Sequence, residues 1–464
     1  MNSWHDTLPE LNEALKGPCF VAGSPGYEDE VAVFNQAIVH HPAMVVGAET
    51  TADVCAAVQF ASRHRMNIAV LNTGHGPSLP AGPETLMITT RRMAKVYIDA
   101  HHKSVRVEAG VRFGQLVEAA AVHGLAPLPG SSPGVGVVGY TLGGGASSTM
   151  GRKYGWASDH VSALEVVTAE GQLHRVCPQS EPELFGALLG GKSNFGVVTA
   201  MEFALFPVTR LYAGCLFYSG EHTRDVLEAY RQFTKSAPEE ITTGVALLNL
   251  PLPHLPPFMQ GKLAVSLRVS YMGDADTGKR LTDPLRKAAP VLLDTVAEIP
   301  YAQFDSITND PTDPAPAVEY FGLLRELTPE AVHAIADVVG RNSDSRLNIV
   351  DIRHLQGAFS RPPTFPHAVG ARDAAFAFFG LTVVPPGHEV VDYLDSGREL
   401  TKALSPWLCD NAHPSFLGRA DATESGTRCA YDPDTYRSLQ AVKAKYNPHN
   451  VFRTNHNILP DTGV

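Results

Sequence analysis

GSSPGVGVVGYTLGGG, residues 130–145, is the stretch that decides the fold. Seven of these residues are glycines, which lack a Cβ atom and let backbone N–H groups approach a ligand closely. Such a run suits an anionic group, for instance a pyrophosphate, held by backbone amides without the dipole of a helix. A flexible loop or a tight packing turn is the alternative for a glycine-rich segment. The apolar residues Val135, Val137, Val138 and Leu142 favour a buried and ordered segment.

Three short motifs match the sequence but are excluded by their context. GSSPG at 130–134 has the pattern of a hydrolase nucleophile elbow, yet two prolines precede it and GVGVVG after it is not expected to be a helix. GVGVVG itself has the dinucleotide-binding pattern, but three consecutive glycines stand where the helix should run. GALLGGKS at 186–193 matches the phosphate loop, although helix-like SEPELF precedes it and a strand-like segment follows. We therefore expect no hydrolase, nicotinamide enzyme or NTPase.

Outward from this stretch, the chain alternates strand-like and helix-like segments between residues 40 and 210. The pattern predicts strands at 68–71 and 104–110, a helix at 113–124 and a hairpin at 161–176. From about residue 211 the pattern is less regular and is interrupted by proline-rich segments. A second domain is expected to begin there.

The composition is that of a soluble globular enzyme. The chain has 464 residues, of which 44% are hydrophobic and 18% charged, so a disordered or coiled-coil protein is excluded. With 37 basic and 48 acidic residues the net charge is -11, which disfavours a nucleic-acid partner. The six cysteines form no C-x-x-C pair and are expected to be reduced thiols, and no metal site is predicted.

Two features bear on the location of the protein. The N-terminal residues lack a basic segment followed by an apolar run, so a cytoplasmic protein is expected. Residues 119–151 carry no charged side chain, but 12 of these 33 residues are Gly or Pro, which a lipid-exposed helix would not tolerate. We therefore expect no membrane partner.

Four ordered segments resemble the flavin-contacting segments of berberine-bridge-enzyme-like oxidoreductases, which belong to the vanillyl-alcohol oxidase superfamily. They are LNTGHGPS at 71–78, the glycine-rich stretch, GGKSNFGVVT at 190–199 and YNPHNVFRTNHNI at 446–458. The resemblance implies an α+β protein with FAD as cofactor. A PCMH-type FAD-binding domain of two subdomains would occupy residues 1–210, with its core at 40–210. A substrate domain, an antiparallel sheet covered by helices, would occupy 211–410, and 411–464 would return to the first domain.

The resemblance also implies how FAD is held. His75 would form a covalent bond to the 8α-methyl group, because a neutral imidazole is nucleophilic near pH 7. Many relatives carry a second bond through a cysteine where this chain has Ser132, so a single bond is expected. Val135 stands where a valine accompanies oxygen access in the family, which favours an oxidase. The implied FAD contacts are Asn72, Thr73, Gly74, His75, Gly76, Gly130, Ser131, Ser132, Val135, Gly136, Val137, Gly139, Thr141, Gly143, Gly144, Gly145, Asn194, Gly196, Val197, Val198, Asn455 and Asn457.

The catalytic residues are less clear from the resemblance. Two tyrosines frequent in relatives are replaced here by Ala146 and His413. His413 is therefore the expected proton acceptor, although it could equally be a surface loop residue, and Tyr140 and Asp351 are alternatives. In the strand-like segments 347–355 and 374–381, His354, Phe376 and Phe378 could bind substrate, and core packing is the alternative for the phenylalanines.

The expected reaction is a two-electron oxidation of a small organic substrate, plausibly an intermediate of secondary metabolism, with oxygen as acceptor. The missing tyrosines leave an alternative open, a redox-neutral flavoprotein that uses the same cavity for cyclisation or as a binding scaffold. The sequence predicts neither the substrate nor the oligomeric state.

Overall fold

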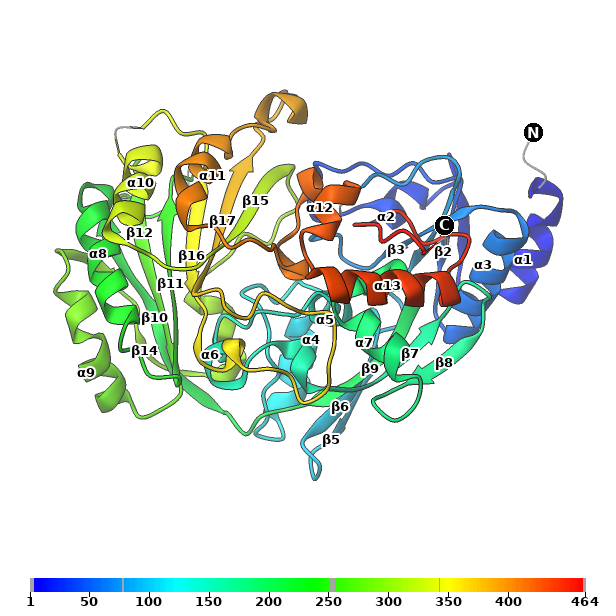
Figure 1. Cartoon of the computed structure of the whole chain (residues 1–464), viewed down its shortest axis with the longest axis horizontal. Helices are drawn as coiled ribbons and strands as arrows, with labels where there is room; N and C mark the ends of the chain where they lie inside the picture. Colours follow the sequence, from blue (N-terminus) through cyan, green and yellow to red (C-terminus); the bar gives the residue numbers. More distant parts are fainter. Residues whose placement is uncertain (1–3, 77–78, 251–254, 342, 462–464) are drawn as a thin grey trace.

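A computed structural model describes residues 4–76, 79–250, 255–341 and 343–461. Pro77 and Ser78, the end of the LNTGHGPS segment, lie outside the described residues. The molecule consists of two bodies side by side, and the C-terminal segment crosses back onto the body that contains the N-terminus (Figure 1). No helix within the described ranges is long and apolar enough to cross a membrane.

The first body begins with a small four-stranded sheet in the order β1-β2-β4-β3. Its strands are β1 (Cys19–Val21), β2 (Met44–Gly47), β3 (Asn67–Leu71) and β4 (Thr85–Thr89). The residues of β2 and β4 are buried throughout, as expected for strands covered on both faces. Helix α3 (Thr51–Arg63) packs on this sheet and starts at a capping box formed by Thr50 and Asp53. The short helices α1 (Leu8–Ala14) and α2 (Tyr27–Val31) complete this part.

A five-stranded antiparallel sheet forms the other half of the first body, in the order β5-β6-β9-β7-β8. Its strands are β5 (Val96–Asp99), β6 (Ser104–Glu108), β7 (Val161–Val167), β8 (Leu173–Val176) and β9 (Val197–Ala204). Helix α4 (Phe113–Ala121) follows β6, as the sequence predicts. The predicted hairpin at 161–176 is present as β7 and β8, and Gly171 between them has a φ of 70°.

The glycine-rich stretch differs from the prediction in one respect. It contains a short helix, α5 (Val137–Leu142), where no helix is expected from GVGVVG. Because the inward-facing Val137 and Val138 are buried in the apolar core, packing outweighs the low helix propensity of Gly139. The helix ends at the glycine triplet, where Gly144 and Gly145 have φ values of 119° and 74°.

The GALLGGKS segment lies at the end of a helix, which agrees with its rejection as a phosphate loop. Helix α7 (Pro182–Gly191) precedes the lysine, and a single turn, η3 (Lys192–Asn194), connects it to β9. A phosphate loop would instead follow a strand and open a helix.

The second body is one eight-stranded sheet with neighbouring strands antiparallel, in the order β13-β10-β12-β11-β16-β17-β15, with β14 beside β10. Its strands are β10 (Arg210–Ser219), β11 (Ile241–Leu248), β12 (Ala264–Tyr271), β13 (Val291–Asp294), β14 (Ala297–Pro300), β15 (Ala317–Leu324), β16 (Ile349–His354) and β17 (Phe376–Val383). Four helices cover its outer face (Figure 1), namely α8 (Thr223–Thr234), α9 (Ala275–Arg286), α10 (Pro329–Val339) and α11 (Arg398–Leu404). The other face is turned toward the first body.

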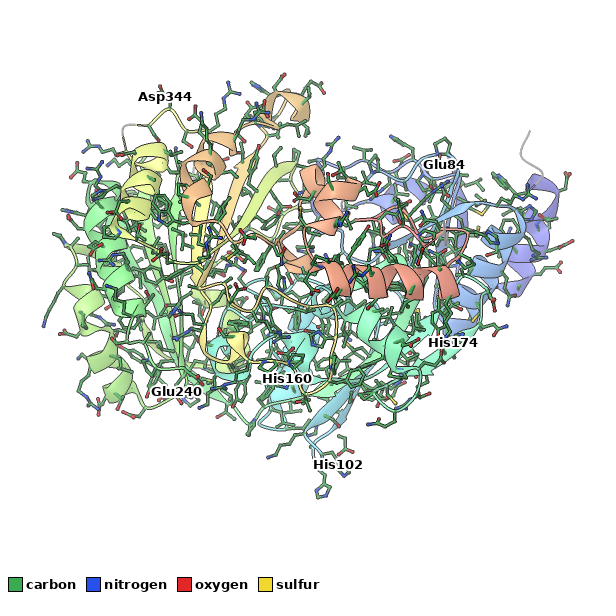
Figure 2. The ribbon with its side chains drawn as sticks, in the orientation of Figure 1. Glu84, His102, His160, His174, Glu240 and Asp344 are labelled. Atoms are coloured by element: carbon green, nitrogen blue, oxygen red, sulfur yellow. The ribbon has the colours of Figure 1, made fainter. Side chains whose placement is uncertain are left out.

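A buried arginine joins the two bodies. Arg152 in α6 (Gly151–Tyr154) is 3% exposed and donates hydrogen bonds to the backbone carbonyls of Ala237, Pro238, Ile241 and Leu355 in the second body, at 2.9 to 3.2 Å. The neighbouring Lys153 forms an ion pair of 2.6 Å with Glu240, which lies at the rim of the molecule (Figure 2).

The C-terminal segment, with α12 (Glu424–Arg428) and α13 (Pro433–Tyr446), packs on the first body. Helix α13 lies against α7, and the N–H of Ile68 donates to the carbonyl of Val451 at 2.8 Å. The buried Lys443 ammonium lies 2.9 Å from the carbonyl oxygen of Phe452 and 3.1 Å from Oδ1 of Asn194. These contacts bring residues 454–458 next to the loop that follows α7.

Candidate functional site

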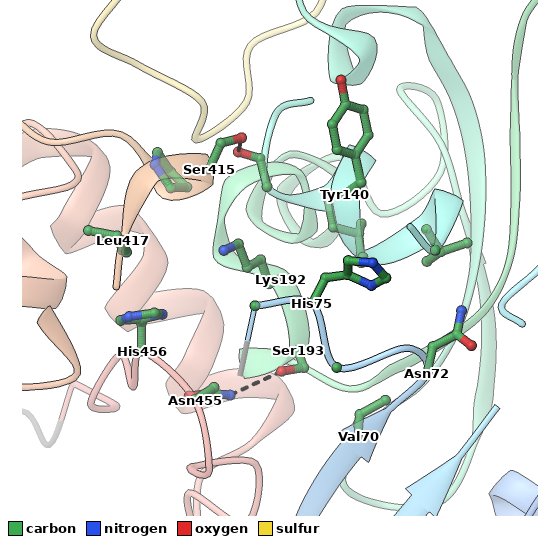
Figure 3. Close-up of a pocket in the computed structure, with 18 of the residues that line it drawn as sticks. Val70, Asn72, His75, Tyr140, Lys192, Ser193, Ser415, Leu417, Asn455 and His456 are labelled. Atoms are coloured by element: carbon green, nitrogen blue, oxygen red, sulfur yellow. Dashed lines mark hydrogen bonds between the residues drawn. The ribbon is translucent and has the colours of Figure 1, made fainter. Parts of the chain in front are cut away.

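A cavity of about 470 Å³ is lined by residues of both bodies. The first body contributes the turn after β3, the exposed face of α5 and the connection from α7 to β9. The second body contributes side chains of β15, β16 and β17. Residues 414–418 and 454–456 of the C-terminal segment complete the wall (Figure 3).

The structure divides the predicted FAD contacts into two groups. Those that line the cavity are Asn72, Thr73, Gly74, His75, Gly76, Val135, Gly136, Gly139, Gly143, Asn194, Gly196, Val198 and Asn455. Those that do not are Gly130, Ser131, Ser132, Val137, Thr141, Gly144, Gly145, Val197 and Asn457. Val137 and Val197 do not line the cavity because successive side chains of a helix or strand point to different faces. Both of these side chains point into the apolar cores of the first body.

The turn after β3 is held in place by its backbone and by a glycine. The N–H groups of Phe34 and Asn35 donate to the carbonyls of Thr73 and Gly74, each at 3.0 Å. Gly74 has a φ of 68°, and a Cβ atom there would lie 2.5 Å from Cβ of Val33. The glycine is therefore required both by its conformation and by the close approach of the 33–35 segment.

His75 stands in this turn and faces the cavity. Its ring stacks on Phe34 with centroids 4.0 Å apart, and Nδ1 lies 2.9 Å from Oγ1 of Thr73. Nε2 is buried and has no hydrogen-bond partner. Burial, with a smaller effect of Arg112, lowers the pKa of His75 to about 4, so the imidazole is neutral at physiological pH.

Tyr140 lines the cavity from α5, and its ring meets Phe113 edge to face with centroids 5.0 Å apart. Its hydroxyl group is buried without a hydrogen-bond partner. Burial raises the pKa of the phenol, while the charge of Arg353 opposes this effect. The hydroxyl group of Tyr140 therefore stays protonated at physiological pH.

The inner face of the large sheet carries different residues from those predicted. Glu319, Phe321, Arg353 and Phe379 line the cavity. Phe376 and Phe378, predicted as substrate contacts, point to the opposite face and are 5% and 1% exposed in the core beneath the covering helices. The prediction identified the strand but chose the wrong alternate residues, because the sequence of β17 is apolar on both faces.

His354 and Asp351 also lie outside the main cavity. Both line a neighbouring cavity of about 30 Å³. One carboxylate oxygen of Asp351 lies 2.7 Å from Arg268 and 2.9 Å from Arg353. Burial alone would raise the pKa of Asp351, but these two guanidinium groups hold it below its usual value. A carboxylate stabilised in this way is a poor proton acceptor, so the structure does not suit the predicted catalytic role of Asp351.

His413 is fully buried and is not part of the cavity wall. Its ring stacks on Trp156 with centroids 4.0 Å apart and lies behind Gly144, where a Cβ atom would be 2.8 Å from its Cε1 atom. Its Nδ1 accepts a hydrogen bond from the N–H of Ser415 at 3.1 Å. Burial lowers the pKa of His413 to about 3. This position does not suit the predicted role of proton acceptor.

Three charged residues that the sequence analysis did not select line the cavity: Lys192, Glu319 and Arg353, the strand neighbour of the selected His354. Burial raises the pKa of Glu319 to about 7, and its carboxylate has one long hydrogen bond of 3.4 Å from Asn35. A signal was available for two of them: Glu319 is charged within an otherwise mostly apolar strand, and Lys192 interrupts a glycine-rich segment. Neither signal says by itself which face of its element meets a ligand.

The residues of the cavity fit an extended ligand such as FAD. Buried polar atoms without partners are available on Asn72, His75, Tyr140 and Asn455. A Cβ atom at Gly136 would lie 2.6 Å from the side-chain nitrogen Nδ2 of Asn72. The backbone of the glycine-rich stretch therefore lies so close to the turn after β3 that a side chain at position 136 would not fit. The walls are apolar at Val70, Val198 and Phe379 and polar between these places.

Comparisons with known proteins agree with this geometry. The chain matches the family model described as FAD binding domain over residues 42–176 and the model described as berberine and berberine like over residues 420–459. It is 25% identical to (R)-6-hydroxynicotine oxidase of Paenarthrobacter nicotinovorans, over 97% of this chain and 98% of that one. It is also 25% identical to chitooligosaccharide oxidase of Gibberella zeae, over 96% and 93%.

Solved structures show the same fold. The crystal structure of 6-hydroxy-D-nicotine oxidase from Arthrobacter nicotinovorans superposes with a TM-score of 0.82 at 24% identity, over 96% of this chain and 98% of that one. Physcomitrella patens BBE-like 1 superposes with a TM-score of 0.84 at 18% identity, over 98% and 99%. The chain is thus an FAD-dependent oxidoreductase of the oxidase type, and over nearly its whole length it is similar to berberine-bridge-enzyme-like oxidoreductases.

Proposed function

We propose that this enzyme holds FAD by one covalent bond from His75 and oxidises a small ring-containing amine or alcohol, with molecular oxygen as acceptor and hydrogen peroxide as product. The observation that carries the proposal is the buried, unpartnered Nε2 atom of His75 on the cavity wall. When bound, FAD accepts the two electrons removed from the substrate, and the protein supplies orientation, exclusion of water and proton transfer.

The surroundings of His75 suit a nucleophile. If Nδ1–H donates to Thr73, Nε2 keeps a lone pair that no other group of the described residues uses. Stacking on Phe34 fixes the plane of the ring. Because burial lowers the pKa of His75 to about 4, nearly all of the imidazole is in the neutral, nucleophilic form at neutral pH.

A single bond is favoured by Ser132. A Cβ atom built on Gly134 would lie 3.6 Å from both the Ser132 hydroxyl oxygen and Cε1 of His75, so the serine stands beside the imidazole. Relatives that form a second bond carry a thiol at this position. A serine hydroxyl is not ionised near neutral pH, in contrast to a cysteine with a lowered pKa, so no second bond is expected.

We infer the substrate class from three aromatic side chains, two on the second body and one on the C-terminal segment. The rings of Phe321 and Phe379 have centroids 5.1 Å apart, and Phe416 lies 6.1 Å from Phe321. Each of these phenylalanines lines the cavity. Aromatic rings pack well on flat, apolar partners, so a ring-containing substrate is favoured over a flexible chain. Such substrates are common among secondary metabolites.

Glu319 is the group that we assign as proton acceptor. Removal of two electrons from an amine or alcohol carbon also requires the loss of a proton from nitrogen or oxygen. Glu319 faces the cavity, and its pKa, raised by burial to about 7, matches the pH at which a general base works best. Tyr140 offers a hydroxyl group that would orient the substrate.

Oxygen as acceptor is supported by two observations. Two relatives that match nearly the whole chain are named as oxidases. Val135, the residue associated with oxygen access in the family, lines the cavity with a small side chain that is partly buried.

The test is to mix the purified flavoprotein anaerobically with a panel of aromatic-ring-containing amines and alcohols, including 6-hydroxynicotine, and with chitooligosaccharides as a polar, non-aromatic alternative. A substrate should bleach the oxidised flavin spectrum, and admission of oxygen should restore the spectrum with one hydrogen peroxide formed per substrate. Conversion of a substrate without any flavin reduction would overturn the proposal in favour of the redox-neutral alternative. Reduction without reoxidation by oxygen would identify a dehydrogenase.

A further inference from the structure

Lys192 lies on the wall of the large cavity, between α7 and β9. It is the first residue of η3, and its backbone has a φ of 55° and a ψ of -132°, which few residues other than glycine adopt. Figure 3 shows its side chain among those that line the cavity, together with His75 and Ser415. A Cβ atom on Gly143 would lie 3.0 Å from Cε of Lys192, so the aliphatic chain crosses the end of α5.

Lys192 forms no hydrogen bond or ion pair with the described part of the chain. The fully buried Lys443 is in contrast surrounded by oxygen acceptors from Asn194, Phe452 and Asn457 at 2.9 to 3.4 Å. Burial lowers the pKa of Lys192 to about 8, with no carboxylate close enough to raise it. Its charge in turn contributes to the lowered pKa values of His413 and His456.

The other titratable groups of the cavity do not compensate this charge, and the Glu319 carboxyl group has no effect on the pKa of Lys192. Arg353 is already paired with Asp351 at 2.9 Å. Burial lowers the pKa of the lining histidines His40, His75 and His456 to about 4, so these rings are neutral. Among the described residues that line the cavity, Lys192 is therefore the one cation without a carboxylate partner.

A partly buried cation on a cavity wall without a partner is unfavourable, and an anionic ligand would compensate it. FAD carries two anionic regions: the diphosphate in every redox state, and the pyrimidine ring of the flavin after reduction. We propose that the Lys192 ammonium group is the counter-ion of one of these anionic regions of bound FAD. This inference extends the proposed function but rests only on FAD as the cofactor, not on the covalent bond, the substrate or oxygen.

The experiment compares the wild-type protein with Lys192→Met, which keeps the length of the side chain and removes its charge. The control is Lys279→Met on the exposed surface of α9, which changes the net charge equally. Lys192→Arg, which retains a positive charge, serves as the rescue variant. All four proteins are first compared by thermal melting to show that they are folded.

Two readouts that do not depend on turnover distinguish the two anionic regions. If Lys192 faces the reduced ring, Lys192→Met should make the midpoint potential of the bound flavin more negative and weaken sulfite binding to the flavin at least tenfold. If it faces the diphosphate, the potential should stay unchanged while the dissociation constant for FAD, measured in a His75→Ala background, rises at least tenfold. Riboflavin, which lacks the diphosphate, should then bind equally well with and without Lys192.

The inference is overturned if Lys192→Met matches Lys279→Met in potential, sulfite affinity and FAD affinity. It is also overturned if Lys192→Arg changes the potential, sulfite affinity or FAD affinity as much as Lys192→Met does, because the positive charge would then not be the property that matters. Failure of the covalent bond would be recognised separately, since free FAD would leave the wild-type protein on denaturation while both Lys192 readouts remain measurable.

Discussion

At the scale of single residues, the site is defined by polar atoms that the protein itself leaves without partners. Most buried polar groups in proteins are hydrogen-bonded, so an unpaired atom on a cavity wall points to a ligand. Nε2 of His75 and the hydroxyl group of Tyr140 are unpaired atoms of residues that line the cavity, and Lys192, which also lines it, forms no hydrogen bond or ion pair with the described residues. Asp351 also has one buried carboxylate oxygen without a partner, but its other oxygen is paired with two arginines and it lies outside the main cavity, so we assign it a structural role.

His75→Ala tests the covalent bond. Wild-type protein precipitated with acid should retain its yellow colour, because the flavin is bonded to the chain, and peptide mapping should locate one FAD on the peptide that contains residue 75. The alanine variant should release its FAD into the supernatant. Release of all flavin from the wild-type protein, or flavin bonded also to Ser132, would contradict the assignment.

Glu319→Gln tests the proton acceptor through the pH dependence of flavin reduction. The folded-state pKa of Glu319 is raised from 4.5 to about 7, so the carboxyl group is protonated below this pH and accepts a proton above it. Anaerobic stopped-flow measurements on the wild-type protein should therefore show a rate that rises with pH through about 7. The glutamine variant should lose this rise and react about 100 to 10,000 times more slowly on the alkaline side.

Tyr140→Phe is the matched control for that experiment. It removes a cavity hydroxyl group without removing a group that titrates near neutrality, so the rate should fall while the rise near pH 7 remains. If Glu319→Gln keeps the wild-type pH profile, Glu319 is not the proton acceptor.

At the scale of elements, the sequence predicted where the site lies better than which side chains face it. The turn after β3 and the glycine-rich stretch could be located because glycines flank a histidine and interrupt apolar runs. The orientation of β17 could not be predicted, because its residues are apolar on both faces of the strand. One of these faces packs on helices that lie far away in the sequence. The burial of His413 could not be predicted either, because its ring stacks on Trp156, a residue that lies far from His413 in the sequence.

Gly145→Ala tests the end of α5 as an element. Gly145 has a φ of 74°, and a Cβ atom would lie 2.6 Å from Cε1 of Tyr140 and 2.8 Å from Cβ of Ala157. Backbone strain and overpacking should together destabilise the protein by about 2 to 4 kcal/mol. The melting temperature should fall and the Tyr140 ring should be displaced, which lowers the rate of flavin reduction. Gly370→Ala is the control, because a Cβ atom there meets nothing within 4 Å. It should change neither the melting temperature nor the rate of flavin reduction.

At the scale of the whole molecule, the cavity depends on how the two bodies are joined, and the sequence gives little warning of the joint. Arg152 and Lys153 are adjacent basic residues in α6, and nothing in the sequence distinguishes them. In the structure Arg152 is buried among four backbone carbonyls of the second body, while Lys153 forms an ion pair with Glu240 at the partly exposed rim. The distinction arises only when the chain is folded.

Arg152→Met and Lys153→Met therefore form a matched pair. Loss of the guanidinium group leaves several buried carbonyl oxygens without donors, which should cost about 2 to 5 kcal/mol of stability. Loss of the surface ion pair should cost less than about 1 kcal/mol. Because the cavity is lined from both bodies, a weaker joint should also slow flavin reduction in Arg152→Met and increase hydrogen exchange in the contacted segments 237–241 and 355–359. Equal effects of the two substitutions, measured by thermal melting and hydrogen exchange, would show that Arg152 does not hold the bodies together.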